Sequence, residues 1–300
     1  MRVLSSIIVI TALLCIPLST QAAKHAEKKE ARTAIVLASF GSTVTEAQDA
    51  EAAFVREAEK RYAPTRVVLA NTARMVMAKN AANGIVIPSL FRALADLADQ
   101  GYTRVAVQSL QLIPGAEYDG IAAVAKAQEG LPKGLEKIGL GAPLMASNED
   151  CEKVAAALIG SLPKERKAGE PVVFVGHGAR HGIGGMVYPA LQWHMANRDA
   201  KIFISTLEGT PDRETTLKAL GKPGAKKPVL WVAPLLGLAG DHAVNDLYGG
   251  GEDSWKSVLT KEGWQVKEAF TPLYGVPAIR EIWFDHLDAA LLALKNDALQ

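Results

Sequence analysis

The chain has 300 residues, with 33 lysines and arginines against 32 aspartates and glutamates, and 49% of it is hydrophobic. A neutral chain of this kind is a poor candidate for wholesale binding of nucleic acid, so any anionic ligand must be held by local cations or backbone N–H groups. The length is ample for an ordinary hydrophobic core that needs no covalent cross-links.

The N-terminus is typical of a secretory signal peptide. Arg2 precedes an uncharged run over 3–16, and the small residues of 19–23 predict cleavage after Ala22 or Ala23. The alternative is a retained membrane anchor, but an anchor needs about 20 apolar residues and this run is shorter. We therefore expect an exported, periplasmic or extracellular protein without stable insertion in the membrane.

The cysteine content agrees with a chain that folds without disulfides. Cleavage removes Cys15 and leaves Cys151 as the single cysteine of the mature protein, so no intrachain disulfide can form in the oxidising compartment. The segment 24–32 is charged and lacks large apolar residues, and we expect it to be a solvated leader.

Short β-branched runs alternate with amphipathic stretches of helical length through the rest of the chain. Strands are predicted over 33–40, 66–70, 104–110, 171–175, 201–206 and 228–233, and helices over 43–62, 73–82, 88–100, 184–196, 212–220 and 276–294. This alternation is typical of α/β proteins in which helices cover both faces of a parallel sheet.

The second half of the chain echoes the first. Residues 35–43 resemble 172–180, each a strand that ends in a small-residue turn, and 105–120 parallel 229–246, each a strand followed by an apolar loop and a polar residue that opens a helix. Generic α/β patterns offer an alternative explanation. We predict two similar doubly wound lobes, 24–150 and 151–300, joined near 143–169, with a cleft between them and the metal site on the second.

Three successive strands of the second half each bring a metal-ligating residue type to one edge. Ligands bind outside the carboxyl ends of the strands in open parallel sheets. His177 follows the strand predicted to end at Val175, Glu208 follows the next strand, and His242 lies in the loop after the third. Two imidazoles and a carboxylate suit a divalent transition ion and leave coordination positions open. Taken singly, each residue has a structural alternative as a hydrogen-bonded histidine, a turn carboxylate or a helix start.

The first half lacks such a ligand set. Ser39 stands where the second half has His177, and Glu117 lies near the counterpart of His242. The opposite wall of the cleft is therefore expected to be polar, with Arg74 nearby.

The remaining histidines have plainer interpretations. His181 is expected at the rim of the site, whereas His194 and His286 lie in helical segments among apolar residues and are expected to pack there. The triplet 180–182 also spells the R-H-G of histidine phosphatases, but it comes past a strand in the middle of the chain and stays a minor alternative. Neither G-x-G-x-x-G after the first strand nor a P-loop lysine occurs, so no nucleotide cofactor is indicated.

Five segments together resemble the anaerobic-type sirohydrochlorin cobaltochelatases, which are class II chelatases. They are "SFGS" (39–42), "NTARMV" (71–76), "VGHGARH" (175–181), "TLEGTP" (206–211) and "AGDHAVND" (239–246), and the resemblance covers 34–294. It implies a bilobal α/β fold shared with ferrochelatase and insertion of Co²⁺, and often Fe²⁺, into the tetrapyrrole sirohydrochlorin for cobalamin or sirohaem synthesis. The family's metal ligands fall on His177, Glu208 and His242. Most such enzymes act in the cytoplasm, so predicted export sets this chain apart.

Metal insertion requires two pyrrole N–H protons to leave. A neutral imidazole accepts a proton near neutral pH, so His177 is expected to be general base as well as ligand. Glu208 would hold and neutralise the ion and His242 would complete the site. The carboxylates of the substrate would be bound by a set of cations and N–H groups, namely Arg74, Lys79, Arg180 and the backbone of 39–42.

The main rival from another class is an exported carrier that binds a metal or a tetrapyrrole such as haem without inserting one. A haem at a contact between subunits would need His25, Met75, Met77 or a residue of the second half, because no histidine lies between 26 and 176. The helix predicted over 276–294 offers a surface for a homo-oligomer.

Overall fold

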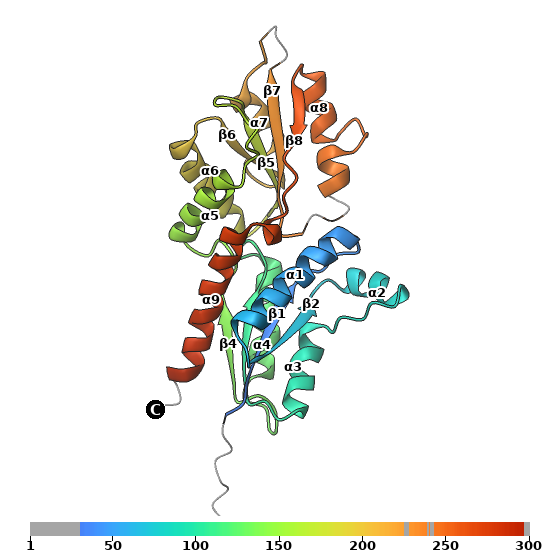
Figure 1. Cartoon of the computed structure of the whole chain (residues 1–300), viewed down its shortest axis with the longest axis vertical. Coiled ribbons are helices and arrows are strands. Elements are labelled where there is room, and N and C mark those ends of the chain that lie inside the picture. The colour runs from blue at the N-terminus through green and yellow to red at the C-terminus, as the bar shows by residue number, and fades with distance from the viewer. Residues whose placement is uncertain (1–30, 225–227, 239, 241–242, 297–300) are drawn as a thin grey trace, which may run out of the picture. The chain divides into compact units, whose positions relative to one another are not determined.

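Two four-stranded β-sheets organise the chain (Figure 1). The structure, a computed structural model, describes residues 31–224, 228–238, 240 and 243–296. The strand orders are β2-β1-β3-β4 and β6-β5-β7-β8, and every pairing is parallel. This confirms the predicted α/β class with two similar lobes. The predicted signal peptide and the predicted ligand His242 lie outside the described residues.

The first sheet and its helices come from the first half of the chain. Their bounds are β1 (Thr33–Ser39), α1 (Thr45–Arg61), β2 (Arg66–Asn71), α2 (Arg74–Ala82), α3 (Leu90–Asp99), β3 (Arg104–Ser109), α4 (Ala116–Gln128) and β4 (Lys137–Gly141). Strand β1 is a nearly continuous buried apolar run because helices cover both faces of its sheet. Helix α3 begins at Leu90 because the Ser89 hydroxyl accepts a hydrogen bond from the Arg92 N–H at 3.3 Å.

The second sheet follows the same plan. The elements of the second half of the chain are α5 (Asn148–Gly160), β5 (Val172–Gly178), η1 (Ile183–Met186), α6 (Val187–Arg198), β6 (Ile202–Glu208), α7 (Arg213–Leu220), β7 (Val229–Leu235), η2 (Ala243–Tyr248), α8 (Trp255–Lys261), β8 (Gln265–Glu268), η3 (Leu273–Gly275) and α9 (Pro277–Asn296). Of these, η1 and η3 are short 3₁₀ helices and η2 is a π-helix. The Asp212 carboxylate caps α7 by accepting from the Thr215 N–H at 2.8 Å.

Strands β5 and β6 run further than the sequence predicted. β5 was expected to end at Val175 and β6 near Thr206, but their pairing continues to Gly178 and Glu208. The glycines of "GHG" look like turn residues, yet here they serve close packing, since a Cβ at Gly176 would lie 2.8 Å from the Tyr188 ring. His177 therefore lies within β5, and Glu208 is the last residue of β6.

The final helix returns to the first half of the chain. α9 packs against β3 and β4 and runs alongside β4 (Figure 1). Gly139 of β4 permits this contact, because a Cβ there would come within 2.5 Å of the Ala290 carbonyl oxygen. The segment 143–169, expected to be the join, contains helix α5, which packs on both α6 and α9. The boundary at residue 150 stays a prediction.

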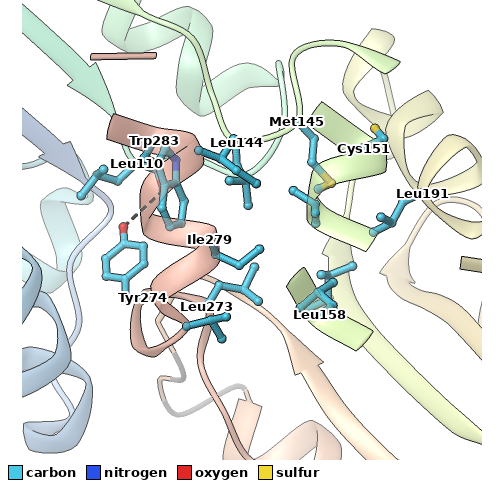
Figure 2. Close-up of a cluster of buried hydrophobic side chains, with 14 of the residues drawn as sticks. Leu110, Leu144, Met145, Cys151, Leu158, Leu191, Leu273, Tyr274, Ile279 and Trp283 are labelled. Carbon is cyan, nitrogen blue, oxygen red and sulfur yellow. Dashed lines mark hydrogen bonds between the residues drawn. The ribbon is translucent and has the colours of Figure 1, made fainter. Parts of the chain in front are cut away.

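A continuous hydrophobic core extends from the first sheet to the second. In β1, Ile35 and Leu37 belong to this core, whereas Val36 faces a separate core on the other side of the sheet. This period-2 division is what a sheet covered on both faces produces. Figure 2 shows part of the shared core, formed by Leu110, Leu144, Met145, Cys151, Leu158, Leu191, Leu273, Tyr274, Ile279 and Trp283. Burial of each large apolar side chain contributes about 1.5–3 kcal/mol.

The cysteine of the described residues is part of this core. Cys151 is a buried free thiol, and burial raises its pKa to about 11. A thiol in such surroundings is chemically inert. Among the described residues, no helix has both the length and the apolar character needed to cross a membrane.

Candidate metal and tetrapyrrole site

A cavity of about 650 Å³ opens where the carboxyl ends of strands from both sheets meet. Its wall includes apolar residues from the loops after β3 and β7, chiefly Leu112, Ile113, Leu236 and Leu238. The polar side chains of the wall include His177, Glu208 and Glu117. A cavity that is mostly apolar with a few convergent polar groups is typical of a site for a small organic ligand.

His177 reaches this cavity from the end of β5. Its side chain is exposed, while Gly176 and Gly178 on either side are buried. The Gly178 N–H donates to the hydroxyl of Tyr188 at 3.2 Å, and burial raises the pKa of Tyr188 to about 12, so this hydroxyl stays protonated at neutral pH. These contacts hold the backbone that carries His177 while its imidazole is free to bind a ligand.

Glu208 reaches the cavity from the end of the neighbouring strand. Gly178 and Glu208 are partners in the register of β5 and β6, which places the two predicted metal ligands on adjacent strands at one edge. An Arg180 guanidinium N–H donates to the Glu208 carboxylate at 3.0 Å. Because these side chains are 69% and 36% exposed, the ion pair contributes at most about 1 kcal/mol, and either partner can exchange it for another ligand.

The third predicted ligand cannot be placed, because His242 lies outside the described residues. Gly240 and the loop 235–238, which precede it in the sequence, line the cavity. Within the described part of the chain, no three His, Cys, Asp or Glu side chains gather closely enough to hold a metal ion. The predicted set of His177, Glu208 and His242 therefore stays a prediction.

The predicted contacts of the first lobe lie at different depths. Glu117 is exposed at the start of α4 and lines the cavity, and its carboxylate accepts from the Thr72 hydroxyl at 3.5 Å. Ser39 is fully buried; its hydroxyl contacts Tyr274 at 3.2 Å and accepts from the Gly41 N–H, so it supports the wall from behind. Arg74 is exposed at the start of α2 and is not among the described residues that line the cavity.

The other histidines with described positions divide as the sequence suggested. His181 is exposed and lines the cavity. His194 is buried, with its Nε2 3.0 Å from the side-chain oxygen of Asn148. His286 lies on α9 between the Ala142 carbonyl oxygen and the Asp150 carboxylate, each at 3.2 Å from a ring nitrogen. His194 and His286 thus tie helices together away from the cavity.

Sequence reasoning missed two tyrosines that shape the site. Tyr188 lies on α6, 10 residues after Gly178, and Tyr274 lies in η3, 235 residues after Ser39; both line the cavity. No local pattern marks them, because their contacts with Gly178 and Ser39 arise only on folding. The apolar wall did leave a signal, since both echoed segments carry an apolar loop after a strand.

Comparison with known proteins finds similarity to cobalt chelatases. A family model described as Cobalt chelatase (CbiK) matches residues 33–292. The chain is 35% identical over 262 residues to the sirohydrochlorin cobaltochelatase CbiKC of Nitratidesulfovibrio vulgaris, and this alignment covers 87% of this chain and 92% of that protein. It is 34% identical over 209 residues to the sirohydrochlorin cobaltochelatase of Salmonella typhimurium, covering 70% of this chain and 76% of that one.

Solved structures with a similar fold include two of proteins named SirB. SirB from Bacillus subtilis with Fe³⁺ matches with a TM-score of 0.63 and 16% identity, over 86% of this chain and 95% of that one. The sirohydrochlorin chelatase SirB from Bacillus subtilis subspecies spizizenii, in complex with cobalt, matches over the same shares with a TM-score of 0.57 and 16% identity. At this identity the likeness concerns the fold alone.

Proposed function

Because the chain belongs to the cobalt chelatase (CbiK) family, we propose that it is a chelatase that inserts Co²⁺ into sirohydrochlorin. The observation that carries the proposal is the cavity, where His177 and Glu208 from adjacent strands of one lobe share a wall with Glu117 of the other. A volume of about 650 Å³ is in the usual range for small-molecule sites, about 300–1,000 Å³.

The metal substrate is bound first by the second lobe. Imidazole and carboxylate groups are suitable ligands for Co²⁺. His177 and His242 would supply two imidazoles, and Glu208 would supply one carboxylate. Glu208 then leaves Arg180, with which it is paired at 3.0 Å, and neutralises part of the charge of the ion. Fe²⁺ has similar ligand preferences and is proposed as a second metal substrate.

His177 acts in two successive roles. While it coordinates the ion, the lone pair of the coordinating nitrogen is occupied and cannot accept a proton. When the ion passes to the nitrogens of the macrocycle, that lone pair is released and takes up one of the two pyrrole protons. The exposed position of His177 at the cavity wall fits both roles, since its ring can face the substrate without leaving β5.

The tetrapyrrole is held by its faces and by its rim. The apolar loops after β3 and β7 contact the flat faces of the macrocycle, where burial of apolar surface drives binding. Arg180, once released from Glu208, is free to bind a substrate carboxylate, and Arg74 at the start of α2 is a second candidate. Binding of the substrate and release of Glu208 for the metal are thereby coupled through one arginine.

The decisive experiment follows the absorbance of sirohydrochlorin with the purified protein and Co²⁺, Fe²⁺ or Ni²⁺. His177→Ala should reduce the rate of Co²⁺ insertion at least 100-fold, the usual contribution of a general base, with little change in thermal stability because the side chain is exposed. His181→Ala, a second exposed histidine of the same wall, is the matched control and should retain most activity.

Two results would contradict the proposal. Full activity of His177→Ala would remove this residue from the mechanism. A spectral change that stops at one equivalent of protein, with no turnover, would instead identify an exported carrier of metal or tetrapyrrole.

Export is the remaining part of the proposal, and it rests on the sequence of residues 1–23. Cleavage should yield a mature chain that begins at Ala23 or Lys24, which mass spectrometry of the protein from the periplasm or medium measures directly. Recovery of the uncleaved chain from the cytoplasm alone would refute it.

A further inference from the structure

A buried carboxyl group lies behind the cavity wall of the first lobe. Glu51 of α1 is 2% exposed. It has no role in the mechanism proposed above. Burial raises the pKa of Glu51 above its ordinary value, and hydrogen bonds from Ser39 and Asn71 offset part of this effect. Among the described residues Glu51 forms no ion pair. An unpaired buried carboxyl is costly and calls for a functional explanation.

A row of hydroxyl groups connects Glu51 to the cavity. Next to it, the hydroxyls of Ser39 and Tyr274 lie 3.2 Å apart. Tyr274 lines the cavity, and its hydroxyl donates to the Leu110 carbonyl oxygen at 3.2 Å, the contact drawn in Figure 2. Asn71, which donates to Glu51, lies directly behind the loop 40–42, since a Cβ on Gly41 would come within 2.8 Å of the Asn71 side chain.

The surroundings of Glu51 can satisfy its charged and its neutral form. When Glu51 is ionised, it accepts from Asn71 Nδ2, at 3.5 Å in this structure, and from the Ser39 hydroxyl. When it is protonated, it needs an acceptor, and Asn71 Oδ1 is buried there without a hydrogen-bond partner. Rotation of the amide by half a turn, or of the Ser39 hydroxyl about its C–O bond, provides that acceptor. The site is therefore equipped for gain and loss of a proton.

We propose that Glu51 accepts one of the two pyrrole protons released on metal insertion, through the hydroxyls of Tyr274 and Ser39. This inference rests on the proposed chelatase function. The Tyr274 hydroxyl turns away from the Leu110 carbonyl oxygen, to which it donates at rest, and toward Ser39 Oγ. The pyrrole N–H bond then breaks, and its proton goes to Tyr274 Oη as the tyrosine proton moves to Ser39 Oγ and the serine proton moves to the Glu51 carboxylate. The lone pair left on the pyrrole nitrogen binds Co²⁺. Return of the proton to water along the same row resets the protein.

The other charged and polar groups described near this row already form hydrogen bonds or ion pairs with other partners. Burial raises the pKa of Tyr274, with the Glu51 carboxylate as a further cause, so Tyr274 passes a proton on and does not ionise. Arg280 of α9 donates to the Glu57 carboxylate at 2.6 Å and to the Tyr274 carbonyl oxygen at 2.8 Å. On the other side, the amides of Gln48 and Asn80 both donate to the Ser42 carbonyl oxygen. Glu51 is thus the acceptor toward which the row leads.

The test is Glu51→Gln, which keeps the shape of the side chain and removes its charge. The matched control is Glu59→Gln, the same change on an exposed position of α1. Insertion of Co²⁺ into sirohydrochlorin is measured from pH 5 to 9. In the wild type, kcat should rise with pH as Glu51 loses its proton. Glu51→Gln should lower kcat about tenfold or more and remove the part of this rise that Glu51 causes, leaving the part that His177 causes, with KM for sirohydrochlorin unchanged and no loss of thermal stability, while Glu59→Gln behaves as wild type.

A second variant tests the connection. Tyr274→Phe interrupts the row but leaves Glu51 in place, so it should show the same loss of kcat at unchanged KM, and it decides the question if Glu51→Gln does not fold. Wild-type kcat and pH profile in either variant would overturn the inference, as would a lower kcat with an unchanged pH profile and a lower melting temperature, which indicates a structural role. Absence of turnover by the wild type would overturn the chelatase function itself, a distinct result.

Discussion

Substitution of Gly178 by alanine should disrupt the site through the backbone alone. Gly178 has φ +85°, a left-handed conformation that costs an L-residue about 1–2 kcal/mol. A Cβ there would also overlap the Glu208 carbonyl oxygen and lie 2.7 Å from the Thr206 Cβ, which forces β5 and β6 apart. Overpacking of this kind costs about 1–3 kcal/mol more, so we expect a loss of about 2–5 kcal/mol in the free energy of unfolding.

Gly182 is the matched control. It has φ +81° and ψ 179°, a conformation almost restricted to glycine, but a Cβ there would have no heavy atom within 4 Å, so Gly182→Ala should cost only the conformational term of about 1–3 kcal/mol. Denaturant unfolding measures both variants, and the rate of Co²⁺ insertion reports whether His177 and Glu208 have moved. Gly178→Ala should lose most activity, whereas Gly182→Ala should keep it. Equal stability and equal activity of the two variants would refute the packing argument.

Two further predictions concern the groups on either side of the cavity. Tyr188→Phe removes the hydroxyl that accepts from the buried Gly178 N–H, so it should lower the free energy of unfolding by about 1–3 kcal/mol and reduce insertion; an unchanged denaturation midpoint would contradict this. Glu51 has a folded-state pKa above its unfolded value, so its contribution to stability is fully present below the unfolded pKa and is lost as pH rises through the folded one. Glu51→Gln should therefore gain stability relative to wild type between pH 4 and 7, and a difference that stays constant over this range would show that Glu51 does not titrate there.

The strands were predictable because a parallel strand buried on both faces leaves a short apolar run. β1 and β7 show this, since nearly every residue in each is buried. The ends of β5 and β6 were predicted too early, because a glycine has the same local signal whether it turns the chain or permits close packing. Only contact with Tyr188 and Glu208 distinguishes the two cases at Gly176 and Gly178.

Much of the candidate site was predictable for a topological reason. Parallel strands deliver their carboxyl ends to one edge, so residues that follow successive strands become neighbours, and His177 and Glu208 do line one cavity. Ser39 shows the limit of this argument. It ends β1 at the equivalent edge, yet its side chain is fully buried and contacts Tyr274, a residue 235 positions away.

From the sequence alone, hydrophobic periodicity thus determined that this is an α/β protein of two similar lobes. The positions of His177 and Glu208 after successive strands predicted that they meet at one edge of a sheet. The return of α9 to the first sheet, the packing of Tyr188 and Tyr274 into the cavity wall and the burial of Glu51 were decided by tertiary structure. These features depend on which surfaces meet after the chain has folded. A local pattern records whether a residue prefers burial, but it does not record which distant group the residue will contact.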